Sequence, residues 1–244
     1  MPALSERLIA VDFDGTVVRG DAPVRYYGAQ IAAGLPGPAA ARYRAALDQY
    51  LSAEPAAAAG RADPAEAAAL AGAIDSWEAA RDLGLCHGVS MAAIKAAFAS
   101  CREWMIGPEC DVGLAAPVID ALASLRAHAR ITLVTNSPEE SMLPLLRRLG
   151  ILDCFDQIVA GAGKPAGMRS FLDRSLADGL GGEGWRIFSL GDHYRNDIEP
   201  AVRIGAATGY IDRYGRADGP ASARGRIAED VLPALRAWAA PTAG

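Results

Sequence analysis

Two carboxylates stand directly after a short apolar run near the start of this 244-residue chain. The run occupies residues 8–11 (Leu-Ile-Ala-Val), and Asp12 and Asp14 follow it, with Gly15 next to the second carboxylate. The run predicts a buried strand, and an ionised carboxylate at its dry end is costly unless it is paired or bound to a metal. Gly15 allows the backbone to turn and re-aim Asp14. Two hard oxygen ligands this close suit Mg²⁺, and one of them could also attack phosphorus.

Polar side chains also follow three other apolar runs, which lie at residues 131–134, 155–159 and 187–190. They are Thr135 and Asn136 after the first run, Lys164 after the second, and Asp192 and Asp197 after the third. Ligands of an open parallel sheet bind beyond the carboxyl ends of its strands. We therefore expect these groups to gather with Asp12 and Asp14 at one edge of a sheet.

The segments that must position these groups alternate between strand and helix. Their patterns predict helices at 117–128, 138–149, 168–177 and 198–204, and a last parallel strand at 207–211. The tail after Gly215 is rich in glycine, proline and alanine, so we expect a loop that closes with a short helix near 231–238. The repeated β-α alternation predicts an α/β fold with a doubly wound parallel sheet.

The interval from residue 21 to residue 111 differs from the rest, because it contains no convincing strand. Alanine-rich patterns predict helices at 24–34, 38–52, 64–83 and 89–105. One helix start is clear, since Asp63 is an N-cap residue followed by Pro64 and, three positions on, by Glu66. The sequence therefore predicts two domains, an α/β core formed by 1–20 and 112–244 and an inserted all-helical domain at 21–111.

Composition limits the class of partner. The formal charge of −5 and the pI near 5.3 leave no basic surface, which argues against a nucleic-acid partner. A small phosphorylated ligand remains compatible, because a bound cation and a local lysine can reverse the sign of charge in a pocket. The four cysteines show no metal-binding or redox spacing and predict reduced thiols in a cytoplasmic protein. No segment has the apolar length of a membrane span, and the oligomeric state stays open.

Several of these residues also have a purely structural explanation. Ser137 starts the string Ser-Pro-Glu-Glu, which is typical of a capping box, so a structural role is favoured and Thr135 is the better phosphate ligand. Asp197 could be the N-cap of the helix that contains Pro200, and Lys164 could be a solvated loop lysine. His193 is expected to be a loop residue.

The chemistry-bearing strings resemble, in this order, the four motifs of the haloacid dehalogenase superfamily. They are residues 12–16 (Asp-Phe-Asp-Gly-Thr), Thr135 at the end of an apolar strand, Lys164-Pro165, and Gly191-Asp192 with Asp197. The helical insertion between the first two motifs resembles the C1-type cap of that family. The resemblance implies a Rossmann-like core in which a cap domain closes over the site.

The resemblance also implies a role for each motif residue. Asp12 would attack phosphorus and form an aspartyl-phosphate, while Asp14 would act as general acid and then general base. Mg²⁺ would be held by Asp12, the main-chain carbonyl of Asp14 and Asp192. Phosphoryl oxygens would be bound by Thr135, Asn136 and Lys164. Asp197 would support the metal shell or Lys164.

We therefore predict a Mg²⁺-dependent phosphatase acting on a small phosphorylated metabolite. Dehalogenases of this superfamily displace halide, which needs no proton, and typically lack an acid at the second aspartate, so Asp14 argues for phosphoryl transfer. A phosphomutase acting on a sugar phosphate is the alternative, and a non-catalytic binding protein with the same fold is a further one. Arg81, Arg102 and Trp104 are candidate substrate-facing residues of the cap, although ordinary surface or packing roles are favoured for each.

Overall fold

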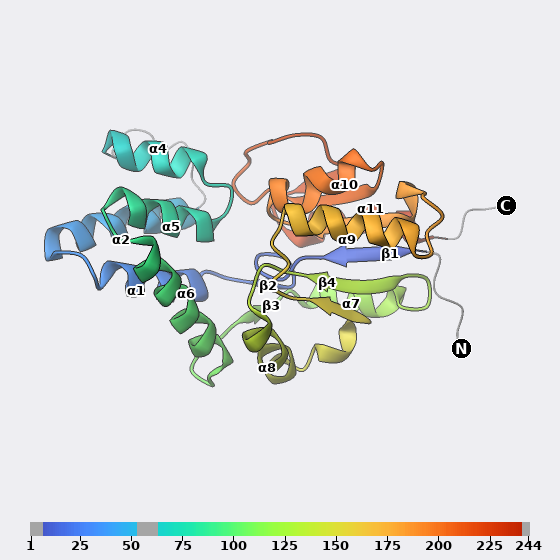
Figure 1. Ribbon diagram of the computed structural model, residues 1–244, viewed down its shortest axis with the longest axis horizontal. Coiled ribbons are helices and arrows are strands. Elements are labelled where there is room, and N and C mark those ends of the chain that lie inside the picture. The colour runs from blue at the N-terminus through green and yellow to red at the C-terminus, as the bar shows by residue number, and fades with distance from the viewer. Residues whose placement is uncertain (1–6, 53–62, 241–244) are drawn as a thin grey trace. The chain divides into compact units, whose positions relative to one another are not determined.

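The computed structural model describes residues 7–52 and 63–240, and these fall into two compact units (Figure 1). One unit contains the described residues up to Arg19 together with those from Gly113 onward, and the other is Gly20–Val112. The chain thus leaves the first unit directly after its first strand region and returns to it after the insertion.

The first unit is built on a six-stranded sheet with the order β5-β4-β1-β6-β7-β8, in which every neighbouring pair is parallel. The strands are β1 (Leu8–Val11), β4 (Arg130–Val134), β5 (Gln157–Val159), β6 (Ile187–Gly191), β7 (Ala207–Ile211) and β8 (Ala223–Gly225). This topology confirms the predicted doubly wound α/β fold. It also brings the ends of β1, β4, β5 and β6 to the same edge of the sheet, because these four strands are consecutive in the order.

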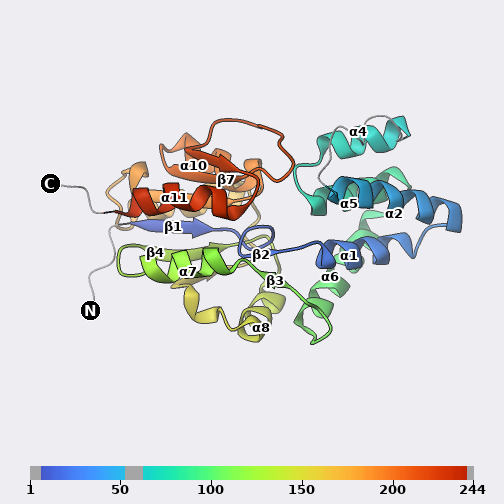
Figure 2. The same ribbon diagram turned by 180° about the vertical axis from the view of Figure 1, so that it is seen from behind.

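Helices cover both faces of this sheet, as the two opposite views show (Figures 1 and 2). The helices are α7 (Ala116–Leu125), α8 (Glu139–Leu149), α9 (Ala166–Ala177), α10 (Glu199–Arg203) and α11 (Ala228–Ala239). Helix α9 contacts α10, and α7 contacts α11. Leu8 and Ala10 pack with Phe171 and Leu172 of α9, because alternate residues of a strand face the same side of a sheet. The buried, apolar β1 therefore anchors the loop that follows it.

Short elements complete the first unit. A two-stranded antiparallel ribbon pairs β2 (Val18–Arg19) with β3 (Gly113–Leu114). Two single 3₁₀ turns, η1 (Leu152–Cys154) and η2 (Gly184–Arg186), precede β5 and β6, and a π-helical turn, η3 (Tyr194–Ile198), precedes α10.

The structure differs from the sequence prediction at two strands. Strand β8 lies in the tail that we expected to be loop, and it is an edge strand of three residues, Ala-Arg-Gly, with no apolar run to signal it. Strand β5 begins at Gln157 rather than at residue 155, because Cys154 and Phe155 close the preceding 3₁₀ turn with main-chain hydrogen bonds. Both differences arise where main-chain pairing, rather than side-chain burial, determines the element.

The described part of the second unit is helical throughout. Its helices are α1 (Ala22–Ala32), α2 (Gly37–Leu51), α4 (Pro64–Gly72), α5 (Ser76–Cys86) and α6 (Met91–Ile106), and α5 contacts the other four. The predicted start at Asp63 is confirmed, since its carboxylate accepts the Ala65 N–H at 2.9 Å. The predicted single helix 64–83 is wrong, because Asp75 begins a new helix by accepting the Glu78 N–H at 2.7 Å.

Aromatic rings pack against one another in the helical unit. Trp77 and Phe98 meet edge to face with ring centroids 5.5 Å apart, and the Arg102 guanidinium lies 4.7 Å from the centre of the Trp77 ring. Arg102 is buried, and Trp104 stacks on Tyr26 at 4.5 Å. These contacts agree with the packing roles favoured for Arg102 and Trp104.

Two further predictions concern the cysteines and membrane-spanning segments. The four cysteines all lie among the described residues and form no disulfide with one another. Within residues 7–52 and 63–240, no helix combines the length and the apolar character that crossing a bilayer requires.

Candidate active site

Lys164 connects three of the strand ends. Its ammonium donates to Asp12 Oδ1 at 2.6 Å, to Asp197 Oδ1 at 2.6 Å and to the main-chain oxygen of Val134 at 2.9 Å. An ammonium has three donors, so each of its N–H bonds has an acceptor. Burial alone would lower the pKa of Lys164, but the two carboxylates outweigh it and raise the pKa above its usual range. The lysine therefore stays charged, and it is not the solvated loop residue that we considered.

Asp12 lies at the end of β1 with its side chain buried. Its N–H donates to Leu190 O at 2.9 Å, which extends the pairing of β1 with β6 by one residue. Burial raises the pKa of Asp12 to about 7, against the opposing effect of Lys164. A second positive charge beside Asp12 would favour its ionised form further. Asp12 is thus a buried carboxylate whose surroundings suit a cation.

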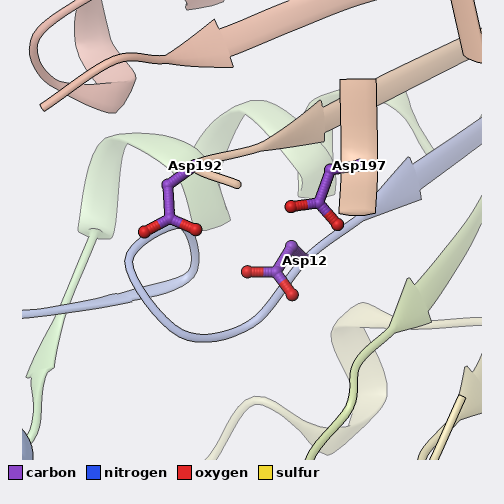
Figure 3. Close-up of side chains that lie close together, drawn as sticks. All are labelled: Asp12, Asp192 and Asp197. Atoms are coloured by element: carbon purple, nitrogen blue, oxygen red, sulfur yellow. The ribbon is translucent and has the colours of Figure 1, made fainter. Parts of the chain in front are cut away.

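Figure 3 shows Asp12, Asp192 and Asp197 gathered around the loop that follows β1. One carboxylate oxygen from each lies within 4.8 Å of the others. Both oxygens of Asp197 already accept hydrogen bonds, from Lys164 at 2.6 Å and from the His193 N–H at 3.1 Å. The hard oxygens of Asp12 and Asp192 form a donor set that fits a divalent cation such as Mg²⁺.

Two glycines make room for this cluster. A Cβ on Gly15 would lie 1.9 Å from Asp192 Oδ2, and a Cβ on Gly191 would lie 2.5 Å from the side chain of Asp197. Gly15 also has a φ of +82°, which other residues rarely adopt. Both carboxylates therefore lie directly against main chain, so a side chain at either glycine would displace them.

Thr135 and Asn136 follow β4 and contact the loop that carries Lys164. Thr135 Oγ1 accepts the N–H of Ser137 at 3.1 Å, and the hydroxyl is buried. Asn136 forms a reciprocal pair with the main chain of Lys164, accepting its N–H at 2.6 Å and donating to its carbonyl at 3.4 Å. The amide of Asn136 therefore holds the Lys164 loop in place. Its predicted contact with phosphate stays a prediction.

Ser137 does not form the expected capping box. Helix α8 begins at Glu139, Pro138 occupies the N-cap position, and no side chain caps that end. Ser137 lies one residue too early to reach the first-turn amides, and its hydroxyl instead donates to Asp14 Oδ2 at 3.0 Å. Sequence reasoning missed this contact, although a hydroxyl two positions after Thr135 at a strand end was a usable signal.

The segment after β6 contains a π-helical turn that was not predicted. His193 lies in the loop between β6 and this turn, as predicted; it is buried, and its Nδ1 accepts the Asn196 N–H at 3.3 Å, so it caps the π-helical turn. Asp197 lies within that turn, and Ile198 is the N-cap of α10. The added turn moves Asp197 away from the cap position and directs it to Lys164.

A model of the haloacid dehalogenase-like hydrolase family matches residues 6–205, which include every residue of the site described above. The chain belongs to this family. No curated protein sequence gives a significant match to this hydrolase. The family match is consistent with the resemblance carried by the four motifs and agrees with the fold of the first unit.

Solved structures share the fold of this hydrolase at low identity. A family member from Bacillus subtilis bound to magnesium has a TM-score of 0.59 at 15% identity, covering 96% of this chain and 100% of its own. A protein from Haemophilus somnus described as a predicted phosphoglycolate phosphatase has a TM-score of 0.58 at 19% identity, covering 96% and 100%. A 2-haloacid dehalogenase from Pseudomonas syringae has a TM-score of 0.51 at 17% identity, covering 95% and 99%. At these identities the likeness concerns the fold alone.

Proposed function

We propose that this hydrolase is a Mg²⁺-dependent phosphatase that cleaves small phosphate monoesters through an aspartyl-phosphate on Asp12. The observation that carries the proposal is the pairing of a buried carboxylate, Asp12, with the Lys164 ammonium 2.6 Å away, beside a second carboxylate at Asp14. A nucleophile alone would serve either branch of the family. The second carboxylate supplies a proton, which an alkoxide leaving group needs and a halide does not.

The proposed reaction proceeds in two displacements. Asp12 attacks phosphorus, the bond from phosphorus to the ester oxygen breaks, and Asp14 gives its proton to that oxygen to release the alcohol. Asp14 then takes a proton from water, which attacks phosphorus and displaces the Asp12 carboxylate as inorganic phosphate forms. Lys164 and Thr135 would hold the phosphoryl oxygens. Asn136 would hold the Lys164 loop in place through its hydrogen bonds to the main chain of Lys164, or would add a further phosphate contact.

Asp12, Asp192 and the main-chain carbonyl of Asp14 would hold Mg²⁺. The ion would supply positive charge that offsets repulsion between the phosphate and the carboxylates. The fit rests on the acidic cluster within 4.8 Å and on the space that Gly15 leaves for Asp192. Asp197 would act on this group indirectly, through its contact with Lys164.

The helical unit Gly20–Val112 is proposed to be the C1-type cap that excludes water during the first displacement. The net charge of −5 supports a small-molecule rather than a nucleic-acid substrate. The absence of a disulfide among the four cysteines, all within the described residues, supports a reducing, cytoplasmic compartment.

The test measures both products that the family can release. The purified protein is incubated with p-nitrophenyl phosphate, a panel of phosphorylated metabolites and 2-chloropropionate, with Mg²⁺ or with a chelator. We expect Mg²⁺-dependent phosphate release, no chloride release, and loss of turnover in Asp12→Asn with the fold retained. Asp173→Asn, on the exposed side of α9, is the matched control. Chloride release without phosphate release contradicts the proposal, as does an isomeric phosphate ester as the main product.

A further inference from the structure

Asp14 is held by a hydroxyl from a different strand end. Ser137 Oγ donates to Asp14 Oδ2 at 3.0 Å, and this contact links the loop after β1 with the loop after β4. We infer that Ser137 is a positioning residue that fixes the orientation of the Asp14 carboxyl group during proton transfer. This inference rests on the proposed function, in which Asp14 is the general acid and base.

Ser137 is itself held rigidly. Its N–H donates to Thr135 Oγ1 at 3.1 Å, and its carbonyl accepts the Gly161 N–H at 2.7 Å. The residue is only 2% exposed, so the hydroxyl has little room to adopt another rotamer. A buried donor whose main chain is held by two hydrogen bonds in this way can fix the group that it contacts.

The loop that carries Asp14 is also closed on itself, which leaves the side-chain torsions as the main freedom of Asp14. The Gly15 N–H donates to Val18 O at 2.9 Å, and the Val18 N–H donates to Phe13 O at 3.0 Å. With its main chain fixed, the orientation of Asp14 is set by contacts to its carboxyl group. The hydroxyl of Ser137 supplies one such contact at Oδ2.

The choice of Oδ2 has a chemical consequence. Because Oδ2 accepts the Ser137 hydroxyl, we assign the proton that Asp14 would transfer in the proposed reaction to the other oxygen, Oδ1. In the first displacement this proton passes to the ester oxygen as its bond to phosphorus breaks. In the second displacement the carboxylate takes a proton from the attacking water. Ser137 changes no bond in either step and acts only by holding Asp14.

A residue that acts only through the general acid leaves a specific kinetic pattern. Loss of the hydroxyl should slow poor leaving groups, which need the proton, more than good ones such as p-nitrophenolate. Misplacing a catalytic group by about an ångström can cost on the order of 100-fold in rate. We expect Ser137→Ala to lower kcat/KM about 10-fold to 100-fold for phenyl phosphate and by less than about 3-fold for p-nitrophenyl phosphate.

The experiment uses a series of substituted phenyl phosphates, from p-nitrophenyl to p-methoxyphenyl, with saturating Mg²⁺ and the full-length protein. The logarithm of kcat/KM is plotted against the pKa of the leaving phenol. A steeper negative slope for Ser137→Ala than for the wild type, with KM for each ester nearly unchanged, supports the inference. Ser137→Thr, which keeps the hydroxyl, should restore the wild-type slope.

Ser141→Ala is the matched control. Ser141 is also buried, lies in the same segment, and donates its hydroxyl to the Pro138 carbonyl at 3.0 Å. Its loss tests the effect of removing a buried serine hydroxyl at the start of α8, and we expect no change in slope. If Ser137→Ala fails to fold, Ser137→Cys carries the test, since its thiol is of similar size and is a much weaker donor.

The outcomes separate this inference from the function on which it rests. A wild-type protein that hydrolyses none of the aryl phosphates contradicts the proposed phosphatase. A wild-type protein that hydrolyses the series, combined with an equal loss for all esters in Ser137→Ala, overturns the inference alone and indicates that Ser137 contacts phosphate directly. A raised KM in Ser137→Ala with an unchanged slope also overturns the inference, because it indicates that Ser137 contributes to substrate binding and not to proton transfer.

Discussion

At the scale of single residues, the charge balance of the site depends on Lys164. Its side chain is 3% exposed and contacts Asp12 and Asp197, whose carboxylates lie within reach of one another. Removing the ammonium would leave two buried like charges together. Breaking a buried ion pair from one side costs more than the pair itself contributes, because the remaining charge is left without compensation.

We therefore expect Lys164→Met to lower the free energy of unfolding by about 3–5 kcal/mol and to abolish phosphatase activity. Saturating Mg²⁺ should recover part of the stability, because a cation beside Asp12 supplies the missing charge. Chemical denaturation with and without Mg²⁺ measures both effects. Lys95, the other lysine of the chain, is exposed on α6, and Lys95→Met provides the control. Equal losses in the two variants would contradict this account of Lys164.

A separate prediction concerns Asp14, whose proposed role is to move a proton and not to bind phosphate. Asp14→Asn can still accept the Ser137 hydroxyl but cannot deliver a proton. We expect kcat for phenyl phosphate to fall about 100-fold or more, with a smaller loss for p-nitrophenyl phosphate. Adding Ser137→Ala to this variant should cost little more, since residues that act through one group are not additive. Additive losses in the double variant would show that the two residues act independently.

At the scale of elements, the strand ends were predictable because an apolar run in the sequence precedes each of them. The apolar runs before Asp12, Thr135 and Asp192 indicate strands, and parallel pairing brings their ends to one edge. The contacts of Ser137 and His193 were missed, because they depend on where α8 begins and on a π-helical turn. A shift of one residue at Pro138 decides whether the serine caps a helix or holds Asp14. The start of α8 is set by the main-chain hydrogen bonds from Ser141 and Met142 to the Pro138 carbonyl, which the local sequence does not specify.

A prediction at this scale concerns Gly15, in the loop after β1. Gly15→Ala would put a methyl group where Asp192 Oδ2 now lies, 1.9 Å from the new carbon. We expect the Mg²⁺ concentration for half-maximal activity to rise about 10-fold or more, because displaced ligands lose metal affinity. Gly88→Ala is the control for backbone strain, as Gly88 has a φ of +83° with nothing within 4 Å of an added Cβ. A loss of Mg²⁺ affinity of similar size in both variants would contradict the explanation.

At the scale of the whole molecule, two units with separate interiors share one chain. The α/β unit is assembled from two separate parts of the sequence, whereas Gly20–Val112 is continuous and has its own packing contact between Trp77 and the buried Arg102. All the residues proposed to bind Mg²⁺ belong to the α/β unit. A ligand that binds one unit stabilises that unit by mass action and leaves the other unchanged unless the two unfold together.

Arg102→Ala tests whether the two units unfold as separate bodies. The buried guanidinium lies 4.7 Å from the Trp77 ring and 4.8 Å from the Phe98 ring, so its loss removes packing inside the helical unit. We expect calorimetry to show two transitions, of which the variant lowers one and Mg²⁺ raises only the other. Arg147→Ala, on the exposed side of α8, should move neither by much. A single transition that responds to both the variant and Mg²⁺ would mean that the two units unfold together, so that a change in the helical unit also affects the residues proposed to bind Mg²⁺.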